Sequence, residues 1–295
     1  MIMRKLRFFI FSSLVVLLIG LSSYLVYNKF QPTTHISGRR AYQDVLAQVS
    51  FGARTPGSTA HAEAIAYIQQ ELEKADWNVQ IQSTVWQGFL VQNIIASRSE
   101  VAPRFIIGAH YDSRLLADQD PGPGRNGPVP GANDGASGVA VLLELARTLP
   151  SNNVPVWLVF FDAEDDGGLD NRQWIMGSRA FVAALTEKPQ AAIIVDMVGD
   201  SDLNIYIERN SDPALTAEIW AQADALGYGR NFIATPKYGM IDDHTPFLEA
   251  GITAADIIDF DYPYWHTSAD TIDKVSAHSL QAMGETLWSW IESQK

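Results

Sequence analysis

Short apolar runs that end in polar residues recur through the middle of the chain. Runs of this length with almost no polar interruption are typical of strands buried on both faces of a sheet. Four such runs are expected strands: residues 104–109, 154–161, 191–195 and 252–258. The residues that follow them directly are His110, Asp162, Asp196 and Asp259. Because ligands of open α/β sheets bind outside the carboxyl ends of the strands, we expect a functional site at this edge.

Helical and strand-like patterns fill the stretches between these runs. Residues 59–75 have the periodicity of an amphipathic helix, and residues 138–149 and 178–185 are the expected crossover helices. Residues 79–85 and 89–97 are expected to form a pair of strands. The pattern predicts an α/β fold with a mixed, largely parallel central sheet and helices on both faces.

The amino-terminal segment has a different character. Residues 8–27 are uncharged and mostly apolar, and a helix of about 20 residues can span a bilayer. Three basic residues in segment 1–7 predict a cytoplasmic end, followed by a linker at 28–39 and the main domain at 40–295. We therefore expect a membrane anchor with the main domain outside the cytoplasm, either periplasmic or extracellular. A cleaved signal peptide, which would give a secreted protein, is the alternative.

Charge and cysteine content narrow the chemistry. The formal net charge of −13 argues against a nucleic-acid partner, which would need a basic face. The sequence contains no cysteine, so disulfides, thiolate metal ligands and cysteine nucleophiles are excluded. Any metal must be held by His, Asp and Glu side chains.

Several histidines and acids are expected at the predicted strand ends or in the loops that follow them. They are His110, Asp134, Glu164, Asp165, Asp196 and His266. Taken alone, each has a simpler interpretation, such as a turn residue, a solvated acid or a packed imidazole. Their repeated placement at one sheet edge favours a metal site, because Zn²⁺ binds about four nitrogen or oxygen ligands. The Pro/Gly-rich stretch 115–130 is expected to form a wall of this site.

Motifs around these residues follow one another in a specific order. They are His-x-Asp at 110–112, Asn-Asp-Gly-x-x-Gly at 133–138, Glu-Asp at 164–165, Asp-Met-Val-Gly at 196–199, Asp-His-x-Pro-Phe at 243–247 and Trp-His-Thr at 265–267. From about residue 51 to the carboxyl terminus, the chain resembles metallopeptidase family twenty-eight, which includes zinc aminopeptidases and the animal-type glutaminyl cyclases. The resemblance implies a phosphorylase/hydrolase-like zinc exopeptidase fold.

The resemblance also implies zinc as the cofactor and suggests a role for each residue. The zinc ligands common to both branches match Asp134, Asp165 and His266, and the general acid/base matches Glu164. His110 and Asp196 match the residues that, with Asp134 as a bridge, hold a second zinc in the aminopeptidases. Asp165 departs from the family, which often has Glu there, but it remains an oxygen ligand.

Three features favour the cyclase branch. Asp242 matches a cyclase aspartate that shares a catalytic hydrogen-bond network with the counterparts of Glu164 and Asp196. Trp265 precedes the histidine ligand as in cyclases, and Trp174 lies in a segment similar to one near the cyclase pocket. Both indoles are expected to bind substrate.

Two activities on the amino termini of peptides or proteins therefore remain open. The favoured one is a glutaminyl-peptide cyclotransferase with one zinc, which converts amino-terminal Gln to pyroglutamate and releases ammonia. The alternative is an aminopeptidase with two zincs, which releases amino-terminal residues. A non-catalytic ectodomain is a minor third possibility, since such a relative would normally lose ligands that this chain keeps. The oligomeric state is not predicted.

Overall fold

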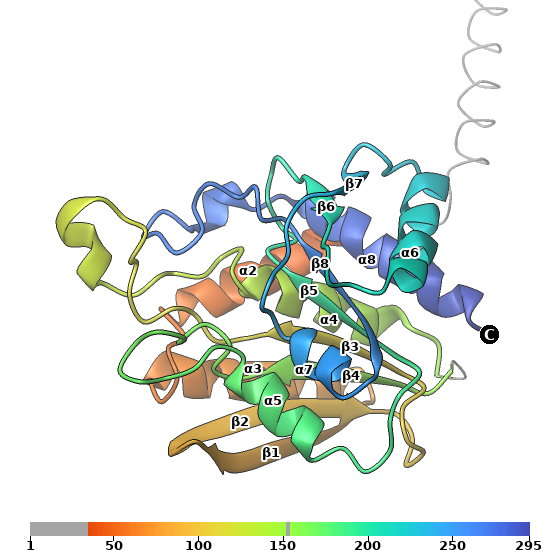
Figure 1. Ribbon diagram of the computed structural model, residues 1–295, viewed down its shortest axis with the longest axis horizontal. Coiled ribbons are helices and arrows are strands. Elements are labelled where there is room, and N and C mark those ends of the chain that lie inside the picture. Colours follow the sequence, from red (N-terminus) through yellow and green to blue (C-terminus); the bar gives the residue numbers. More distant parts are fainter. Residues whose placement is uncertain (1–34, 152–153) are drawn as a thin grey trace, which may run out of the picture. The chain divides into compact units, whose positions relative to one another are not determined.

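The computed structural model describes residues 35–151 and 154–295, and its compact unit extends from Ile36 to Lys295 (Figure 1). The predicted basic end and membrane span lie outside the described residues, as does the linker up to residue 34. Within the described ranges, no helix is both long and apolar enough to cross a membrane. Helix α2 (Gly38–Ser50) begins inside the predicted linker, with the Ser37 side chain accepting from the Arg40 N–H. The folded domain therefore starts slightly before residue 40.

A six-stranded sheet forms the centre of the domain, in the order β1-β2-β4-β3-β5-β8. Its strands are β1 (Asn78–Trp86), β2 (Phe89–Ser97), β3 (Phe105–His110), β4 (Val156–Phe161), β5 (Ala191–Asp196) and β8 (Thr253–Ile258). The β1–β2 and β2–β4 pairs are antiparallel, whereas β4, β3, β5 and β8 run parallel to one another. Every residue of β3 and β5 is buried, as expected for central strands covered on both faces.

Helices cover both faces of this sheet (Figure 1). One face packs against a large core to which α2, α3 (Thr59–Lys74), α4 (Ala136–Thr148), α6 (Pro213–Ala225) and α8 (Ala277–Ser293) contribute. The other face packs against α5 (Met176–Ala183) and α7 (Thr245–Glu249), whose Phe181 and Phe247 contact Phe161 of β4. The remaining elements are the strand pair β6 (Ile205–Ile207) and β7 (Phe232–Pro236) and the 3₁₀ helices η1 (Gly122–Asn126) and η2 (Ile272–Lys274).

The predicted mixed, largely parallel sheet with helices on both faces is confirmed. The strand pair, the four buried strands and the three predicted helices are all present, with boundaries shifted by a few residues at most. His110 and Asp196 are the last residues of β3 and β5 rather than the first residues of the following loops. Both side chains therefore project from the rigid carboxyl edge of the sheet.

Candidate metal centre and substrate pocket

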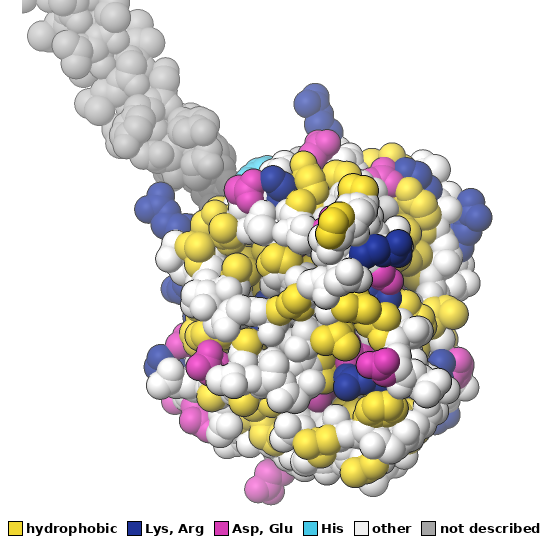
Figure 2. Space-filling view, turned by 90° about the vertical axis from the view of Figure 1, so that its left-hand side faces the viewer, with side chains coloured by type: hydrophobic (Ala, Val, Ile, Leu, Met, Phe, Trp, Pro, Cys, Tyr) yellow, Lys and Arg dark blue, Asp and Glu magenta, His cyan; other side chains and the backbone are white. Residues whose placement is uncertain are grey.

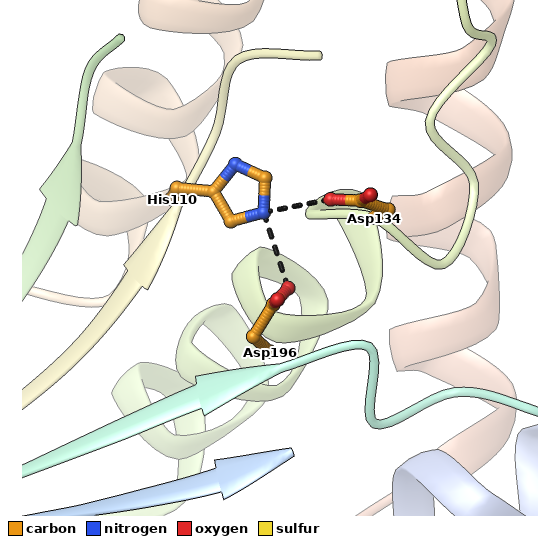
Figure 3. Close-up of side chains that lie close together, drawn as sticks. All are labelled: His110, Asp134 and Asp196. Atoms are coloured by element: carbon orange, nitrogen blue, oxygen red, sulfur yellow. Dashed lines mark hydrogen bonds and ion pairs between the residues drawn. The ribbon is translucent and has the colours of Figure 1, made fainter. Parts of the chain in front are cut away.

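His110 connects two buried carboxylates at the carboxyl edge of the sheet (Figure 3). Its Nε2 atom lies 3.1 Å from Asp134 Oδ1 and 3.1 Å from Asp196 Oδ1. The imidazole packs closely on the main chain at the start of α4, where a Cβ atom on Gly135 would lie 2.4 Å from the same nitrogen. These three side chains form one group whose ligand atoms could surround a single cation.

Asp134 also belongs to a second group of possible ligands. Its Oδ2 atom lies 3.9 Å from His266 Nε2, and this nitrogen lies 2.8 Å from Asp165 Oδ1. Within each group, the ligand atoms lie within 4.8 Å of one another. The two groups are adjacent and share Asp134, which is the arrangement that the family resemblance implied for one or two metal ions.

The carboxylate oxygens of the second group fit a bound cation. Asp134 Oδ2 and Asp165 Oδ2 are buried and have no hydrogen-bond partner among the described residues. Burial, together with the Asp134 carboxylate, raises the pKa of Asp165 to about 7. Buried, unpaired carboxylates are costly unless a positive charge compensates them. A zinc ion held by Asp134, Asp165 and His266 would supply that charge with ligand types that Zn²⁺ accepts.

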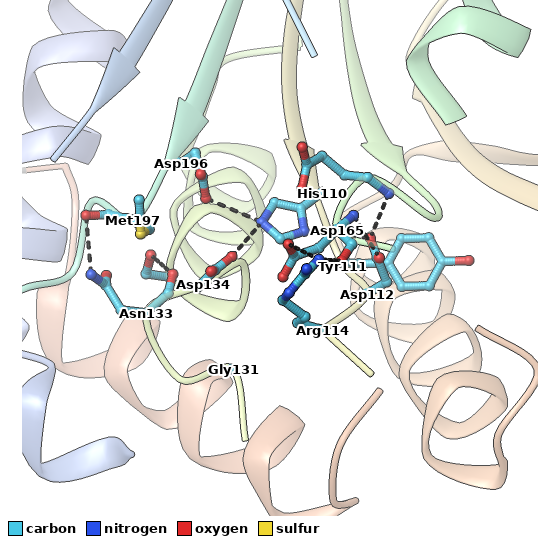
Figure 4. A network of polar contacts seen from close by, with 12 residues as sticks. His110, Tyr111, Asp112, Arg114, Gly131, Asn133, Asp134, Asp165, Asp196 and Met197 are labelled. Atoms are coloured by element: carbon cyan, nitrogen blue, oxygen red, sulfur yellow. Dashed lines mark hydrogen bonds and ion pairs between the residues drawn. The ribbon is translucent and has the colours of Figure 1, made fainter. Parts of the chain in front are cut away.

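Asp112 contacts residues of both ligand groups within the polar network shown in Figure 4. Its Oδ1 and Oδ2 atoms accept hydrogen bonds of 3.2 Å from the main-chain N–H groups of Glu164 and Asp165, respectively. Asp112 Oδ1 also lies 3.4 Å from His110 Nδ1, so Nε2 is left facing the other carboxylates. Asp112 was not among the predicted site residues, although the His-x-Asp spacing was a signal for a carboxylate that orients the histidine.

A cavity of about 340 Å³ opens over the second group. Its lining includes the predicted site residues Asp134, Glu164, Asp165, Trp174, Asp196, Asp242, Trp265 and His266. Only His110 among the predicted residues is not part of the lining, because it lies behind Asp134 and Asp196. The remaining lining residues, which the sequence did not predict, are Met197, Gly239, Met240, Ile241, Ile258 and Phe260. The cavity is therefore lined partly by carboxylates and partly by apolar side chains.

Asp242 influences the protonation of two other acids in the cavity. Burial and then the Asp165 carboxylate raise the pKa of Glu164 well above its ordinary value, and Asp242 contributes further. Burial raises the pKa of Asp196 to about 7 although the His110 ring opposes the shift, and Asp242 again contributes. The Asp242 carboxylate therefore affects both Glu164 and Asp196, close to the candidate metal ligands.

Two indoles flank His266. The Trp265 ring stacks on the imidazole at a centroid distance of 3.8 Å, and the Trp174 ring lies parallel to it at 5.9 Å. The Arg114 guanidinium lies 4.8 Å from the Trp174 ring centroid and donates a 2.7 Å hydrogen bond to the Asp165 carbonyl oxygen. These contacts fix the pocket wall against the ligand-bearing loops.

The loop 115–130 was expected to form a pocket wall, and this prediction is wrong. None of its residues belongs to the described lining of the cavity. The loop instead supports His266 from outside: the Gln119 N–H donates to the His266 carbonyl oxygen at 3.2 Å, and Asp118 Oδ1 lies 3.5 Å from His266 Nδ1. Figure 2 shows the end of the molecule at which this loop lies in Figure 1, with hydrophobic side chains among scattered charges.

Comparison with known proteins gives a consistent result. Residues 93–291 match the family model described as Peptidase family M28. Aminopeptidase YwaD of Bacillus subtilis is 30% identical over 198 residues, which cover 61% of this chain but only 38% of the relative. The crystal structure of Porphyromonas gingivalis glutaminyl cyclase superimposes with a TM-score of 0.83 at 34% identity, covering 89% of this chain and 100% of that one.

A third relative carries zinc in its name. The Zn-dependent exopeptidase of Parabacteroides distasonis superimposes with a TM-score of 0.81 at 29% identity, covering 87% of this chain and 98% of that one. The family model covers more than half of the sequence and includes every predicted ligand position. The chain therefore belongs to peptidase family M28, as its order of motifs predicted.

Proposed function

We propose that this chain is a zinc-dependent glutaminyl-peptide cyclotransferase, which closes amino-terminal Gln to pyroglutamate and releases ammonia. The observation that carries the proposal is the position of Asp242 in the same cavity as Glu164 and Asp196. A third carboxylate there suits a site that exchanges protons between buried acids. The similarity to the glutaminyl cyclase of P. gingivalis over nearly the whole domain supports it.

The metal would be held by Asp134, Asp165 and His266, whose ligand atoms converge beneath the cavity. When bound, zinc would act as a Lewis acid that polarises the side-chain carbonyl of the substrate glutamine. The Trp174 and Trp265 rings both stack on His266, so this side of the site is largely aromatic and would limit the access of water to a bound substrate. Low water access favours cyclisation, because the nucleophile is the substrate's own α-amine.

Glu164 is the proposed general acid/base. In the reaction, a bond forms between the α-amino nitrogen and the Cδ atom of the glutamine, and the bond from Cδ to the amide nitrogen breaks. The attacking amine loses one proton and the leaving amide nitrogen gains one, so a single carboxylate can make both transfers. The raised pKa of Glu164 suits a group that must hold that proton between the two steps.

Asp196 and Asp242 would assist without binding a second metal. Both lie in the cavity with Glu164, and Asp242 contributes to the raised pKa of each partner. Neighbouring carboxylates share protons because they cannot all be ionised at once. A proton retained between Asp196 and Asp242 would compete with a cation at the group formed with His110.

An aminopeptidase is the second candidate, and one observation favours it. The group of His110, Asp134 and Asp196 has the ligand types and spacing for a second zinc, which the two-metal hydrolases require. The similarity to Aminopeptidase YwaD points the same way, although this chain spans little more than a third of that protein.

Replacement of Asp242 by Asn tests the choice. In a cyclase, D242N should reduce pyroglutamate formation strongly while one zinc per chain remains bound, because Asp242 serves proton transfer only. Metal analysis of the purified protein and assays on Gln- and Leu-initiated peptides provide the measurements. Two zincs in the wild type, with unchanged Leu release in D242N, would favour the aminopeptidase.

We also propose that the catalytic domain lies outside the cytoplasm and is held at the membrane by residues 8–27. The basic residues that precede this apolar run support that orientation. Protease accessibility of the domain in intact spheroplasts, compared with lysed spheroplasts, tests it. Protection from the protease in intact spheroplasts would contradict the proposal.

A further inference from the structure

Arg54 is a fully buried cation that the proposed mechanism does not use. Its side-chain hydrogen bonds within the described chain all go to main-chain carbonyl oxygens. Nε donates to Tyr111 at 3.0 Å, Nη1 to Pro130 at 2.9 Å and Nη2 to Gly131 at 2.6 Å. One guanidinium thus links the residue after His110 to the loop that leads to Asp134.

The loop held by Arg54 has little freedom to adjust. Gly131 has a φ of +70°, and a Cβ atom there would lie 2.5 Å from the Asp134 carbonyl oxygen and 2.6 Å from Arg54 Nη2. The left-handed conformation and the close contacts both require glycine. The three residues that follow this glycine, 132–134, therefore start from a fixed point at Gly131 (Figure 4).

The Asp270 carboxylate binds the same loop through the main-chain N–H groups of that loop. Its Oδ1 atom accepts the Asn133 N–H at 2.9 Å, and its Oδ2 atom accepts the Asp134 N–H at 3.2 Å. The Tyr262 hydroxyl donates to Asp270 Oδ1 at 2.6 Å and fixes that carboxylate in turn. Arg54 thus holds the carbonyl groups of the loop while Asp270 holds its N–H groups.

We propose that Arg54 and Asp270 are paired positioning residues that place the Asp134 carboxylate between the two groups of metal ligands. The inference rests on the proposed metal site, because its effect is on metal binding. Arg54 connects this loop to the strand end that carries His110, and Asp270 lies four residues after His266. The pair therefore connects three of the ligand-bearing segments through one short loop.

The planar shape of the Arg54 guanidinium matters more than its charge for the position of the Asp134 loop. Three donors in one plane meet three carbonyl oxygens, whereas a lysine ammonium on a flexible stem cannot reproduce that geometry. An Arg54→Lys variant keeps the positive charge but loses the fork, meaning the planar set of N–H donors of the guanidinium. If Arg54 acted only as a charge near the acids, this variant would bind metal like the wild type.

The chain offers a control in Arg98, which is partly buried whereas Arg54 is fully buried. Its side chain also donates to three main-chain carbonyl oxygens, at 2.5 Å to Leu149 and at 2.9 Å to both Ala75 and Ala146. These partners contribute no side chain to the two ligand groups. An Arg98→Lys variant therefore reports the general cost of losing such a fork, without an effect on the Asp134 loop.

Zinc affinity of the full-length, detergent-solubilised protein tests the proposal, measured by competition with a chromogenic chelator. We expect Arg54→Lys and Asp270→Asn to weaken zinc binding by about 10–100-fold, the range seen when groups behind metal ligands are changed. Arg98→Lys should bind zinc like the wild type, even if its apo form melts earlier. Circular dichroism establishes whether each variant is folded. If Arg54→Lys does not fold, the zinc affinity of Asp270→Asn alone tests the proposal.

Two results would overturn the inference while leaving the proposed function intact. One is wild-type zinc affinity in the folded Arg54→Lys and Asp270→Asn variants. The other is an equal loss of affinity in Arg98→Lys, which would assign the effect to global stability. A wild-type protein that binds no zinc would refute the proposed metal site itself, and the inference with it.

Discussion

Replacement of Gly135 by Ala probes the packing that holds the His110 ring in place. An added Cβ atom would lie 2.4 Å from Nε2, 2.5 Å from Cδ2 and 2.6 Å from Cε1 of that ring. All three distances are shorter than real Cβ contacts allow. The imidazole must therefore move, because the methyl group is attached to the main chain at the start of α4.

The size of the effect follows from two opposing contributions. Overpacking of a filled interior costs about 1–3 kcal/mol. The φ of Gly135 is −111°, which alanine adopts readily. Because alanine lowers the conformational entropy of the unfolded chain, the substitution also stabilises the folded protein by about 0.4–1 kcal/mol. Gly127→Ala measures this entropy contribution alone, since a Cβ at Gly127 would approach described atoms no closer than 3.7 Å.

Urea unfolding of both variants in the presence of a chelator gives the comparison. We expect Gly135→Ala to be less stable than Gly127→Ala by about 1–3 kcal/mol. His110 should also lose its contacts with Asp134 and Asp196. Equal unfolding free energies for the two variants would refute the claim that the His110 ring is tightly packed on α4.

Three further predictions concern separate parts of the domain. Glu164→Gln should retain zinc but lower the rate of turnover by about 10²–10⁴-fold, as measured by steady-state kinetics beside metal analysis. His266→Ala should lose zinc, and with it the stabilisation of about 2.7 kcal/mol that a metal at 100 times its Kd provides, as seen in thermal melts with and without added zinc. Burial opposes ionisation of Glu208, but the His244 ring and main-chain N–H groups outweigh it and lower the Glu208 pKa to about 2, from an ordinary value of 4.5. Because the pKa of Glu208 is lower in the folded than in the unfolded chain, its ionised side chain stabilises the fold above about pH 4.5, and this stabilisation is lost as the pH falls toward 2. The unfolding free energy of Glu208→Gln should therefore fall less steeply with decreasing pH than that of the wild type.

The sequence predicted the central sheet well for a physical reason. Parallel strands covered on both faces must be apolar along their whole length, so β3 and β5 could be identified directly. The short strands β6 and β7 pair only with each other, and most residues of β7 are not buried, so their sequence contains no such signal. Their positions depend on tertiary contacts.

The candidate ligands were predictable because their chemistry is visible in the residue types. Arg54 was not, because its partners are main-chain carbonyl oxygens, which every residue has. The loop 115–130 was misplaced for a related reason: its composition indicates an exposed turn-rich segment but not which neighbour it contacts. The apolar part of the pocket, with Met240 and Ile241, comes from a segment without a regular pattern.

The reaction catalysed by the wild-type protein distinguishes a glutaminyl cyclase from an aminopeptidase. Two peptides that differ only in an amino-terminal Gln or Leu should be incubated with the zinc-loaded protein, and the products analysed by mass spectrometry and an ammonia assay. We expect the Gln peptide to lose one ammonia without chain cleavage and the Leu peptide to remain unchanged. Release of free Leu, with no ammonia formed from the Gln peptide, would contradict this expectation.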